Sequence, residues 1–239
     1  MSEGLLYFKE VYDVVPGWVQ KMHEYSPNAL DHYTNLRSNI MQEGALTKKE
    51  KDILLVGMNA ARLYERSMVY HTKGAMDGGA TLPELVEYLI VSYLYNGTKA
   101  LKTGIKSLEY ALELKGIRYP EGSGHKETTE EILLYMIELL GDEETGFVSN
   151  VLKLVKSEDQ NSLKDYILSD SAVSKRLKHI LMTGIFITEL KGEQVGEWME
   201  AARLNGASEE QLAEVGLICL LTAGIPAWFE ASDSLIENK

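Results

Sequence analysis

Apolar residues recur along most of this chain at the spacing of amphipathic α-helices. In two stretches the apolar and small side chains fall at intervals of one, three and four residues, which places them on one helical face. The first stripe is Ile53, Leu54, Gly57, Ala60, Ala61 and Tyr64, and the second is Leu85, Tyr88, Leu89, Ser92 and Tyr93. Alternating patterns typical of β-strands are nearly absent. The sequence therefore predicts an all-α fold.

Polar residues and glycines between these stripes mark where the helices begin and end. In a capping box, a hydroxyl and an acid or amide three residues later each satisfy the other's free backbone N–H. Helix starts of this kind are predicted at Thr47–Glu50, Thr81–Glu84, Thr128–Glu131, Ser157–Gln160 and Ser208–Gln211, and Ser26 before Pro27 predicts another. Glycines that suit left-handed C-terminal caps are Gly78, Gly79, Gly97, Gly116, Gly141, Gly206 and Gly224.

The chain repeats itself. Gly79-Ala80 and Gly206-Ala207 follow matching helices, and a shift of 127 residues (206 minus 79) superposes the two segments without gaps. The same shift aligns Lys51 with Lys178, Leu54 with Leu181, Gly57 with Gly184, Ala75 with Ala202, Leu85 with Leu212, Glu87 with Glu214, and Gly97 with Gly224. We interpret the chain as a tandem duplication. The predicted units are residues 1–115 and 129–239, joined by an irregular linker over 116–128.

Composition narrows the classes of function. The formal charge of −12 and the lack of a basic patch argue against nucleic-acid binding. No stretch approaches the roughly 20 apolar residues of a membrane span, and the first residues lack a signal-peptide pattern. One cysteine, Cys219, forms neither an internal disulfide nor a thiolate metal cluster. We expect a soluble cytoplasmic protein that binds a small molecule, with no metal, cofactor, membrane or nucleic acid.

Short motifs in both copies resemble the carboxymuconolactone decarboxylase family, whose relatives include the alkyl hydroperoxidase D type proteins. The first copy has His71, Ala75, Gly79-Ala80-Thr81 and Glu84, followed by Tyr95-Asn96-Gly97-Thr98-Lys99-Ala100. The second copy has Ala202, Gly206-Ala207-Ser208 and Ala223-Gly224-Ile225-Pro226-Ala227. The resemblance implies an antiparallel helical bundle, here made of two tandem repeats. It also implies a homo-oligomer with sites near subunit contacts.

The chain departs from the peroxidase branch of that family. This branch carries two cysteines ahead of its histidine, and these positions fall on Tyr64 and Ser67 here. In the second copy they fall on Lys191 and Gln194, and Trp198 stands where the histidine belongs. Thiol-based peroxide reduction needs a thiolate and a resolving partner, so we do not expect it. We expect Cys219 to be a core residue and the second copy to be a structural unit without a site.

The first copy keeps a set of residues suited to acid–base chemistry. Tyr64, Ser67 and His71 lie on one helical face, and Glu65 flanks it. The family's proton-relay glutamate corresponds to Asp52. Arg62 and Arg66 are candidate cations for a substrate carboxylate. The alternative for each is ordinary: a histidine packed in the core, a solvated carboxylate, or an Asp52 that only favours the N-terminal end of its helix.

Geometry leaves open whether Asp52 and His71 meet. They are 19 residues apart, which is roughly 28 Å along an unbroken helix. No glycine or proline between Met58 and Tyr64 indicates a break.

Two functions remain. One is a non-redox enzyme, a decarboxylase-like lyase, that acts on a small organic acid or lactone through His71. The alternative is a non-catalytic member that binds a ligand or serves a structural role.

Overall fold

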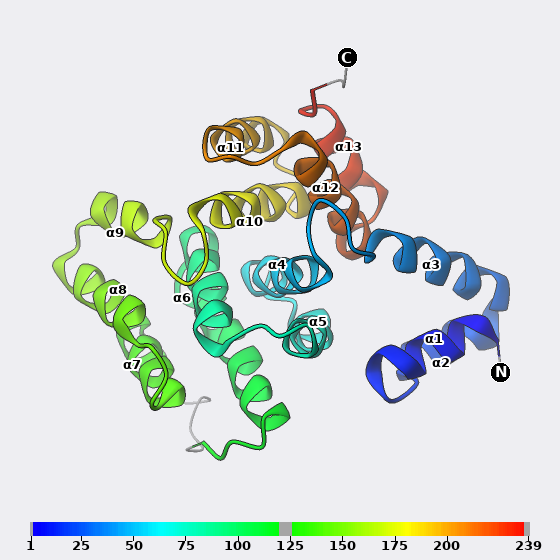
Figure 1. The fold of residues 1–239 in the computed structure, drawn as a ribbon, viewed down its shortest axis with the longest axis horizontal. Coiled ribbons are helices and arrows are strands. Elements are labelled where there is room, and N and C mark those ends of the chain that lie inside the picture. Colours follow the sequence, from blue (N-terminus) through cyan, green and yellow to red (C-terminus); the bar gives the residue numbers. More distant parts are fainter. Residues whose placement is uncertain (1, 120–125, 237–239) are drawn as a thin grey trace.

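The computed structural model describes residues 2–119 and 126–236, and every regular element in these ranges is an α-helix (Figure 1). The all-α prediction is confirmed. The helices that precede the predicted linker are α1 (Glu3–Tyr12), α2 (Gly17–Tyr25), α3 (Pro27–Ile40), α4 (Lys48–Ala61), α5 (Glu65–Asp77) and α6 (Leu82–Leu114). Those that follow it are α7 (Thr129–Leu140), α8 (Gly146–Ser157), α9 (Gln160–Ile167), α10 (Lys175–Thr188), α11 (Gly192–Leu204), α12 (Glu209–Ala223) and α13 (Ile225–Ser232). The predicted linker over 116–128 falls between the two sets, and its residues 120–125 lie outside the described ranges. None of the helices described is both long and apolar enough to cross a membrane.

Most helix boundaries follow the predicted caps. Capping boxes form at Thr47, Thr81, Thr128 and Ser208, and Ser26 caps α3 with Pro27 in its first turn. One start was wrong: Ser157 ends α8, and the Asp159 side chain caps α9 instead. Six of the seven predicted glycines adopt positive φ, and Gly78 is the exception, since its φ is −75°.

The backbone repeats with the same period as the sequence. Positive φ occurs at Leu63 and Leu190, at Gly79 and Gly206, and at Gly97 and Gly224, and each pair is separated by 127 residues. Helices α4 and α5 thus correspond to α10 and α11. The kink at Asn96–Gly97 inside α6 corresponds to the boundary between α12 and α13.

The two copies are interlocked through α4 and α10, which pack against each other near the centre of the molecule (Figure 1). A Cβ on Gly57 would lie 2.8 Å from Leu181, and one on Gly184 would lie 2.1 Å from Met58. Both glycines therefore permit the close approach of the two helices.

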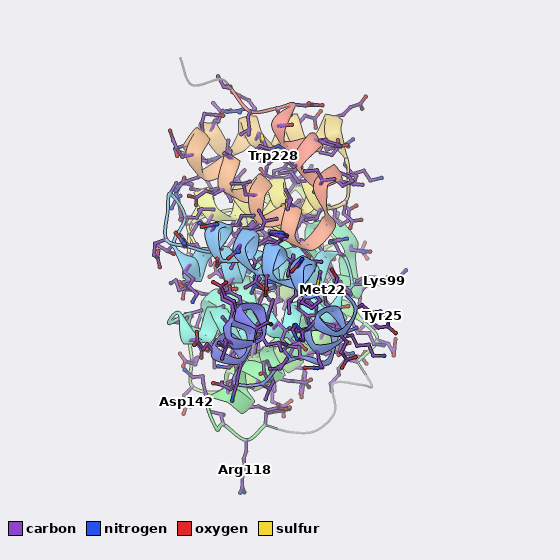
Figure 2. All side chains as sticks on the ribbon, turned by 90° about the vertical axis from the view of Figure 1, so that its right-hand side faces the viewer. Met22, Tyr25, Lys99, Arg118, Asp142 and Trp228 are labelled. Carbon is purple, nitrogen blue, oxygen red and sulfur yellow. The ribbon has the colours of Figure 1, made fainter. Side chains whose placement is uncertain are left out.

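The first three helices form a layer of their own beside α5. Phe8, Val19 and Leu30 are fully buried in a cluster that also contains Trp18 and Tyr33. This cluster is separate from the main core, to which both copies contribute. Figure 2 shows the elongated molecule from the side of this layer, with Trp228 near one end and Arg118 and Asp142 at the other.

Candidate functional site

The chain reverses direction between Asp52 and His71. Helix α4 ends at Ala61, and Leu63 adopts a left-handed conformation with φ of 61°. The N–H of Tyr64 then donates to the Asn59 carbonyl at 2.8 Å, and that of Leu63 donates to Ala60 at 3.1 Å. This is the Schellman pattern, which a glycine at the left-handed position normally indicates. The break exists although no glycine marks it, so the unbroken helix considered above is wrong.

The reversal brings Asp52 of α4 against His71 of α5. The Nδ1 atom of His71 lies 2.9 Å from Oδ1 of Asp52. The two residues are only 3% and 7% exposed, so water screens the contact poorly. The contact between Asp52 and His71, left open by the sequence, is therefore made.

The environment of His71 favours its neutral form. Burial lowers the pKa of the imidazole, while the Asp52 carboxylate partly opposes that shift. Since an ionised carboxylate only accepts, Nδ1 carries the hydrogen of this bond. The other ring nitrogen, Nε2, makes no hydrogen bond with the described residues. It is nevertheless not sealed from solvent, unlike the Thr34 hydroxyl, which is both buried and unpaired. Nε2 is thus a free base that solvent can reach.

A glycine makes room for this pair. A Cβ built on Gly74, one turn after His71, would lie 2.5 Å from Oδ2 of Asp52. Such a distance is too short for a real contact, so any larger residue would displace the carboxylate. The position therefore requires glycine for as long as Asp52 points at His71.

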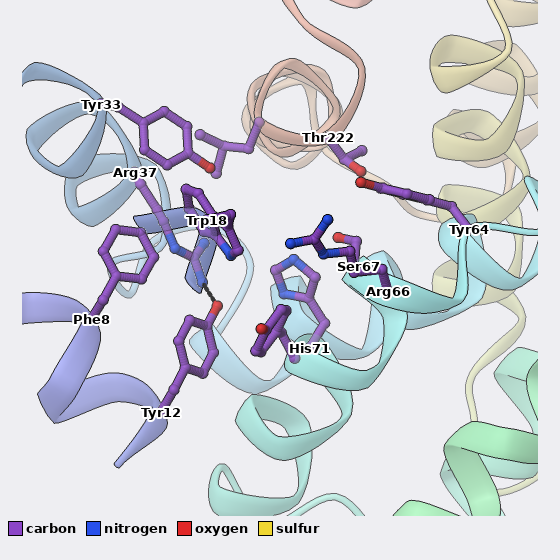
Figure 3. Close-up of a pocket in the computed structure, with 12 residues that line it drawn as sticks. Phe8, Tyr12, Trp18, Tyr33, Arg37, Tyr64, Arg66, Ser67, His71 and Thr222 are labelled. Carbon is purple, nitrogen blue, oxygen red and sulfur yellow. Dashed lines mark hydrogen bonds between the residues drawn. The ribbon is translucent and has the colours of Figure 1, made fainter. Parts of the chain in front are cut away.

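His71 faces a cavity of about 320 Å³ between the N-terminal helices, α5 and α12 (Figure 3). Aromatic side chains make up much of its lining: Phe8, Tyr12, Trp18, Tyr33, Tyr64 and Tyr70. The polar groups are His71, Ser67, Arg37, Arg66 and Thr222, and Leu221 adds an aliphatic side chain. Leu221 and Thr222 belong to the second copy, so both copies build the cavity.

The predicted site residues divide into two groups. Tyr64, Ser67, Arg66 and His71 line the cavity, and Asp52 supports the His71 ring. Figure 3 shows Ser67 and Arg66 on the same helix as His71.

Arg62 and Glu65 lie elsewhere. Arg62 pairs with Glu189 at 3.2 Å and donates to the Thr222 carbonyl, so it joins the two copies. The exposed Glu65 pairs with Lys106. Neither side chain lines the cavity.

A polar network fixes Ser67. The amide of Asn59, which is fully buried, donates to the Ser67 hydroxyl at 3.3 Å and accepts a hydrogen bond from Thr222 at 3.1 Å. Because the Ser67 oxygen accepts from Asn59, its own hydrogen remains available to a ligand.

Arg37 and the aromatic residues of α1–α3 were missed by the sequence reasoning. Arg37 is only 5% exposed, and its Nη2 donates to the Tyr12 hydroxyl at 2.7 Å. One pattern in the sequence could have revealed it: Leu30, Tyr33, Arg37 and Ile40 fall at intervals of three and four on α3. An arginine on the apolar face of a helix is unusual and warrants a reason.

The second copy lacks this arrangement. His179 and Trp198 occupy the positions of Asp52 and His71, and their rings lie 5.9 Å apart. His179 contacts the Lys175 carbonyl through Nδ1, at 2.8 Å. There is no carboxylate–imidazole pair at this position.

Cys219 lies in the main core, fully buried, as expected. Its sulfur is 3.5 Å from the Gly184 carbonyl oxygen. Burial raises the pKa of this thiol, which disfavours the reactive thiolate.

Comparison with known proteins agrees with the resemblance seen in the sequence. Residues 27–110 match the model of the carboxymuconolactone decarboxylase family. A crystal structure of a "putative gamma-carboxymuconolactone decarboxylase subunit" from Burkholderia xenovorans has a similar fold, with a TM-score of 0.58 and 17% sequence identity. That match covers 97% of this chain and 94% of the other. No curated protein matches the chain in sequence.

Proposed function

Starting from a carboxymuconolactone decarboxylase family segment at residues 27–110, we propose that the chain is an acid–base enzyme acting on a small organic acid or lactone. The observation that carries the proposal is the Asp52–His71 pair, 2.9 Å apart, at the wall of a polar and aromatic cavity. A neutral imidazole held by a carboxylate, with its second nitrogen open to a cavity, is the arrangement of a general base.

The proposed proton transfer uses Nε2 of His71. A substrate C–H next to a carbonyl gives its proton to Nε2, and the electron pair moves onto the carbonyl oxygen. Asp52 stabilises the imidazolium that forms, because the carboxylate lies against Nδ1. The imidazolium then returns the proton to a carbon of the same substrate. A decarboxylation would remove no C–H proton. The bond to the carboxylate carbon breaks, carbon dioxide leaves, and the electron pair of that bond moves onto the conjugated carbonyl oxygen. A His71 imidazolium that has taken its proton from solvent then protonates the carbon that lost carbon dioxide.

Neighbouring groups suit charge that develops on the substrate. Ser67 has a hydroxyl hydrogen to donate, and Arg66 places a cation at the same wall of the cavity. Asn59 holds Ser67 in place, and a donor fixed before the reaction stabilises a developing oxyanion without having to reorganise.

The test is a screen for turnover of small carboxylates and lactones. Turnover is measured by the change in ultraviolet absorbance and by the release of carbon dioxide. His71→Ala is expected to lower turnover by about 10²–10⁴-fold, because it removes the base. Asp52→Asn should also lower it, since the amide no longer stabilises the imidazolium. Circular dichroism and thermal unfolding establish that each variant folds.

Trp198→Phe is the matched control, since it changes the position in the second copy that corresponds to His71. It should leave turnover unchanged. Equal turnover by wild type and His71→Ala would contradict the proposal. A wild type that turns over nothing in the panel would favour the alternative, a ligand-binding member without catalysis.

The proposed assembly is a homo-oligomer and the proposed compartment the cytoplasm. The first rests on the family resemblance, and the second on a lone cysteine, which suits a reducing environment.

A further inference from the structure

Arg37 is a buried cation that has no carboxylate partner among the residues the structure describes. Its guanidinium makes one hydrogen bond among the described residues, from Nη2 to the Tyr12 hydroxyl. No carboxylate oxygen of these residues lies within 4.0 Å of it; Asp52 contributes charge from farther away. Burying a charge is costly unless the charge is paired and hydrogen-bonded. An anion from outside the chain would supply what is missing.

The unused donors of Arg37 are accessible from the cavity. Arg37 lines the same cavity as His71. Among the described residues, no nitrogen of Arg37 is both unpaired and sealed from solvent. Figure 3 shows the guanidinium held to Tyr12 on the side of the N-terminal helices, across from Arg66. A planar guanidinium with open N–H groups matches the geometry of a carboxylate.

Flat aromatic rings surround Arg37. The ring centroids of Phe8 and Trp18 lie 5.1 Å apart, and the two rings meet edge to face. The ring centroids of Phe8 and Tyr33 lie 6.4 Å apart, and the planes of these two rings differ by 2°. Trp18 and Tyr33 are also edge to face, at 6.0 Å. All three rings line the cavity. Such a set packs well against the face or edge of another π-system, and less well against a puckered aliphatic ring.

We infer that the cavity binds a planar ring carboxylate, aromatic or conjugated, with its carboxylate on Arg37 and its ring against the partly exposed Trp18 and Tyr33, which the fully buried Phe8 supports from behind. A volume of about 320 Å³ suits a single ring with short substituents. This inference rests on the proposed function only in taking the same cavity as the substrate site, and it assigns the ligand class and its anchor. Arg37, rather than the Arg62 or Arg66 considered from the sequence, is the cation that binds the carboxylate.

The experiment measures equilibrium binding, not turnover, with three small probes. Benzoate has the ring and the charge, cyclohexanecarboxylate has the charge with a puckered ring, and benzamide has the ring without the charge. Titration calorimetry gives each Kd for the full chain. Benzoate is expected to bind about 3- to 10-fold more tightly than cyclohexanecarboxylate, from the aromatic contacts. It should bind roughly 10- to 100-fold more tightly than benzamide, from the charge-assisted hydrogen bonds.

Two variants locate the anchor. Arg37→Met keeps much of the apolar stem of the side chain. It should weaken the binding of benzoate by roughly 10- to 100-fold and leave the Kd of benzamide unchanged. Arg118→Met, at an exposed position that is not among the residues lining the cavity, is the matched control and should bind benzoate as the wild type does. The comparison of probes on the wild type needs no variant, so it stands even if Arg37→Met folds poorly.

The outcomes separate this inference from the proposed function. If benzoate binds His71→Ala and the wild type equally, and neither turns over any substrate, the acid–base proposal fails while the ligand class stands. If Arg37→Met binds benzoate as tightly as the wild type, or benzamide binds as tightly as benzoate, Arg37 is not the anchor. If cyclohexanecarboxylate binds as tightly as benzoate, the requirement for a planar ring is wrong.

Discussion

The two copies share their mutual contacts but differ in their chemistry. Lys51 of the first copy pairs with Glu214 of the second at 3.1 Å, and Lys178 of the second pairs with Glu87 of the first at 2.8 Å. Each glutamate also accepts two backbone N–H groups from the loop before α4 or α10: Ala45 and Leu46 in one case, Ala172 and Val173 in the other. All of these residues correspond under the 127-residue shift. We call these two lysine–glutamate pairs, with their backbone hydrogen bonds, the interlock. The interlock is therefore the same from the first copy to the second as from the second to the first.

The corresponding positions of the site show no such agreement. Asp52, Ser67, His71 and Gly74 of the first copy become His179, Gln194, Trp198 and Ala201 in the second. Gly74 is informative, because it leaves space for the Asp52 carboxylate, and the second copy has alanine where that carboxylate is absent. The lysine–glutamate contacts between the copies thus agree in both directions, whereas the residues of the candidate site do not.

The largest expected effect comes from breaking the interlock at Lys178. Lys178→Met leaves Glu87 buried without its cation, since the two side chains are 1% and 3% exposed. Removing one partner of a buried pair costs about 3–5 kcal/mol. Urea unfolding followed by circular dichroism would measure this loss.

Lys51→Met is the matched variant on the other side of the interlock. It should cost less, nearer 1–3 kcal/mol, because the side chain of Glu214 is 22% exposed and water can solvate it. If the two variants lose equal stability, solvent access does not govern the difference. If neither loses stability, the interlock is not what couples the copies.

The next effect concerns activity and rests on Gly74. Gly74→Ala should push the Asp52 carboxylate off the His71 ring, since the new Cβ would lie within 2.9 Å of both carboxylate oxygens. A misplacement of this size in a catalytic group can lower turnover on the order of 100-fold. Alanine favours the helix by about 1 kcal/mol, but overpacking against the buried Asp52 carboxylate costs more, so the free energy of unfolding should fall by roughly 1–3 kcal/mol. Turnover and urea unfolding measure the two effects separately.

Ala201→Gly makes the reverse change in the second copy. It should cost about 1 kcal/mol of stability through helix propensity and leave turnover as in the wild type. Normal turnover in Gly74→Ala would mean that Asp52 finds another route to His71, or that it does not support the reaction.

The sequence predicted what depends on local pattern. Helix starts at Thr47, Thr81, Thr128 and Ser208 were found because a capping box is confined to four residues. The resemblance to the family suggested Asp52 as the proton relay, but the sequence left open whether Asp52 meets His71. The turn that joins them was missed, because Leu63 occupies a left-handed conformation that costs a leucine about 1–2 kcal/mol and that tertiary packing must support. Leu190 repeats it in the second copy, so the fold imposes this turn twice.

The wall of the cavity was beyond local reasoning. Phe8, Trp18, Tyr33 and Arg37 come from three helices, and only the packing of α1–α3 beside α5 brings them to His71. Arg62 was a candidate cation for a substrate carboxylate, yet it pairs with Glu189 of the other copy. Distance along the chain is a poor guide where the chain reverses.

The smallest expected effect is a dependence of stability on pH, to which both copies contribute. Burial lowers the pKa of His71 and of His179; Asp52 opposes the shift in the first, and the Lys175 carbonyl opposes it in the second. In the unfolded chain each imidazole titrates near 6.5. As the pH falls below about 6.5, the unfolded chain therefore takes up protons that the folded chain does not, and stability is lost until the folded pKa is passed.

Urea unfolding between pH 7.5 and 5.5 should show this loss as a slope, and the slope should be shallower in His71→Gln and in His179→Gln. A change in the slope of stability against pH shows that the substituted histidine takes up a proton on unfolding. The hydrogen bond that either substitution removes shifts the stability by the same amount at every pH. If only His179→Gln flattens the slope, Asp52 has cancelled the effect of burial on His71, and His71 is partly protonated near neutral pH. The first copy would then supply an acid at Nε2 where the neutral ring supplies a base, and the proposed proton transfer would have to begin from the imidazolium.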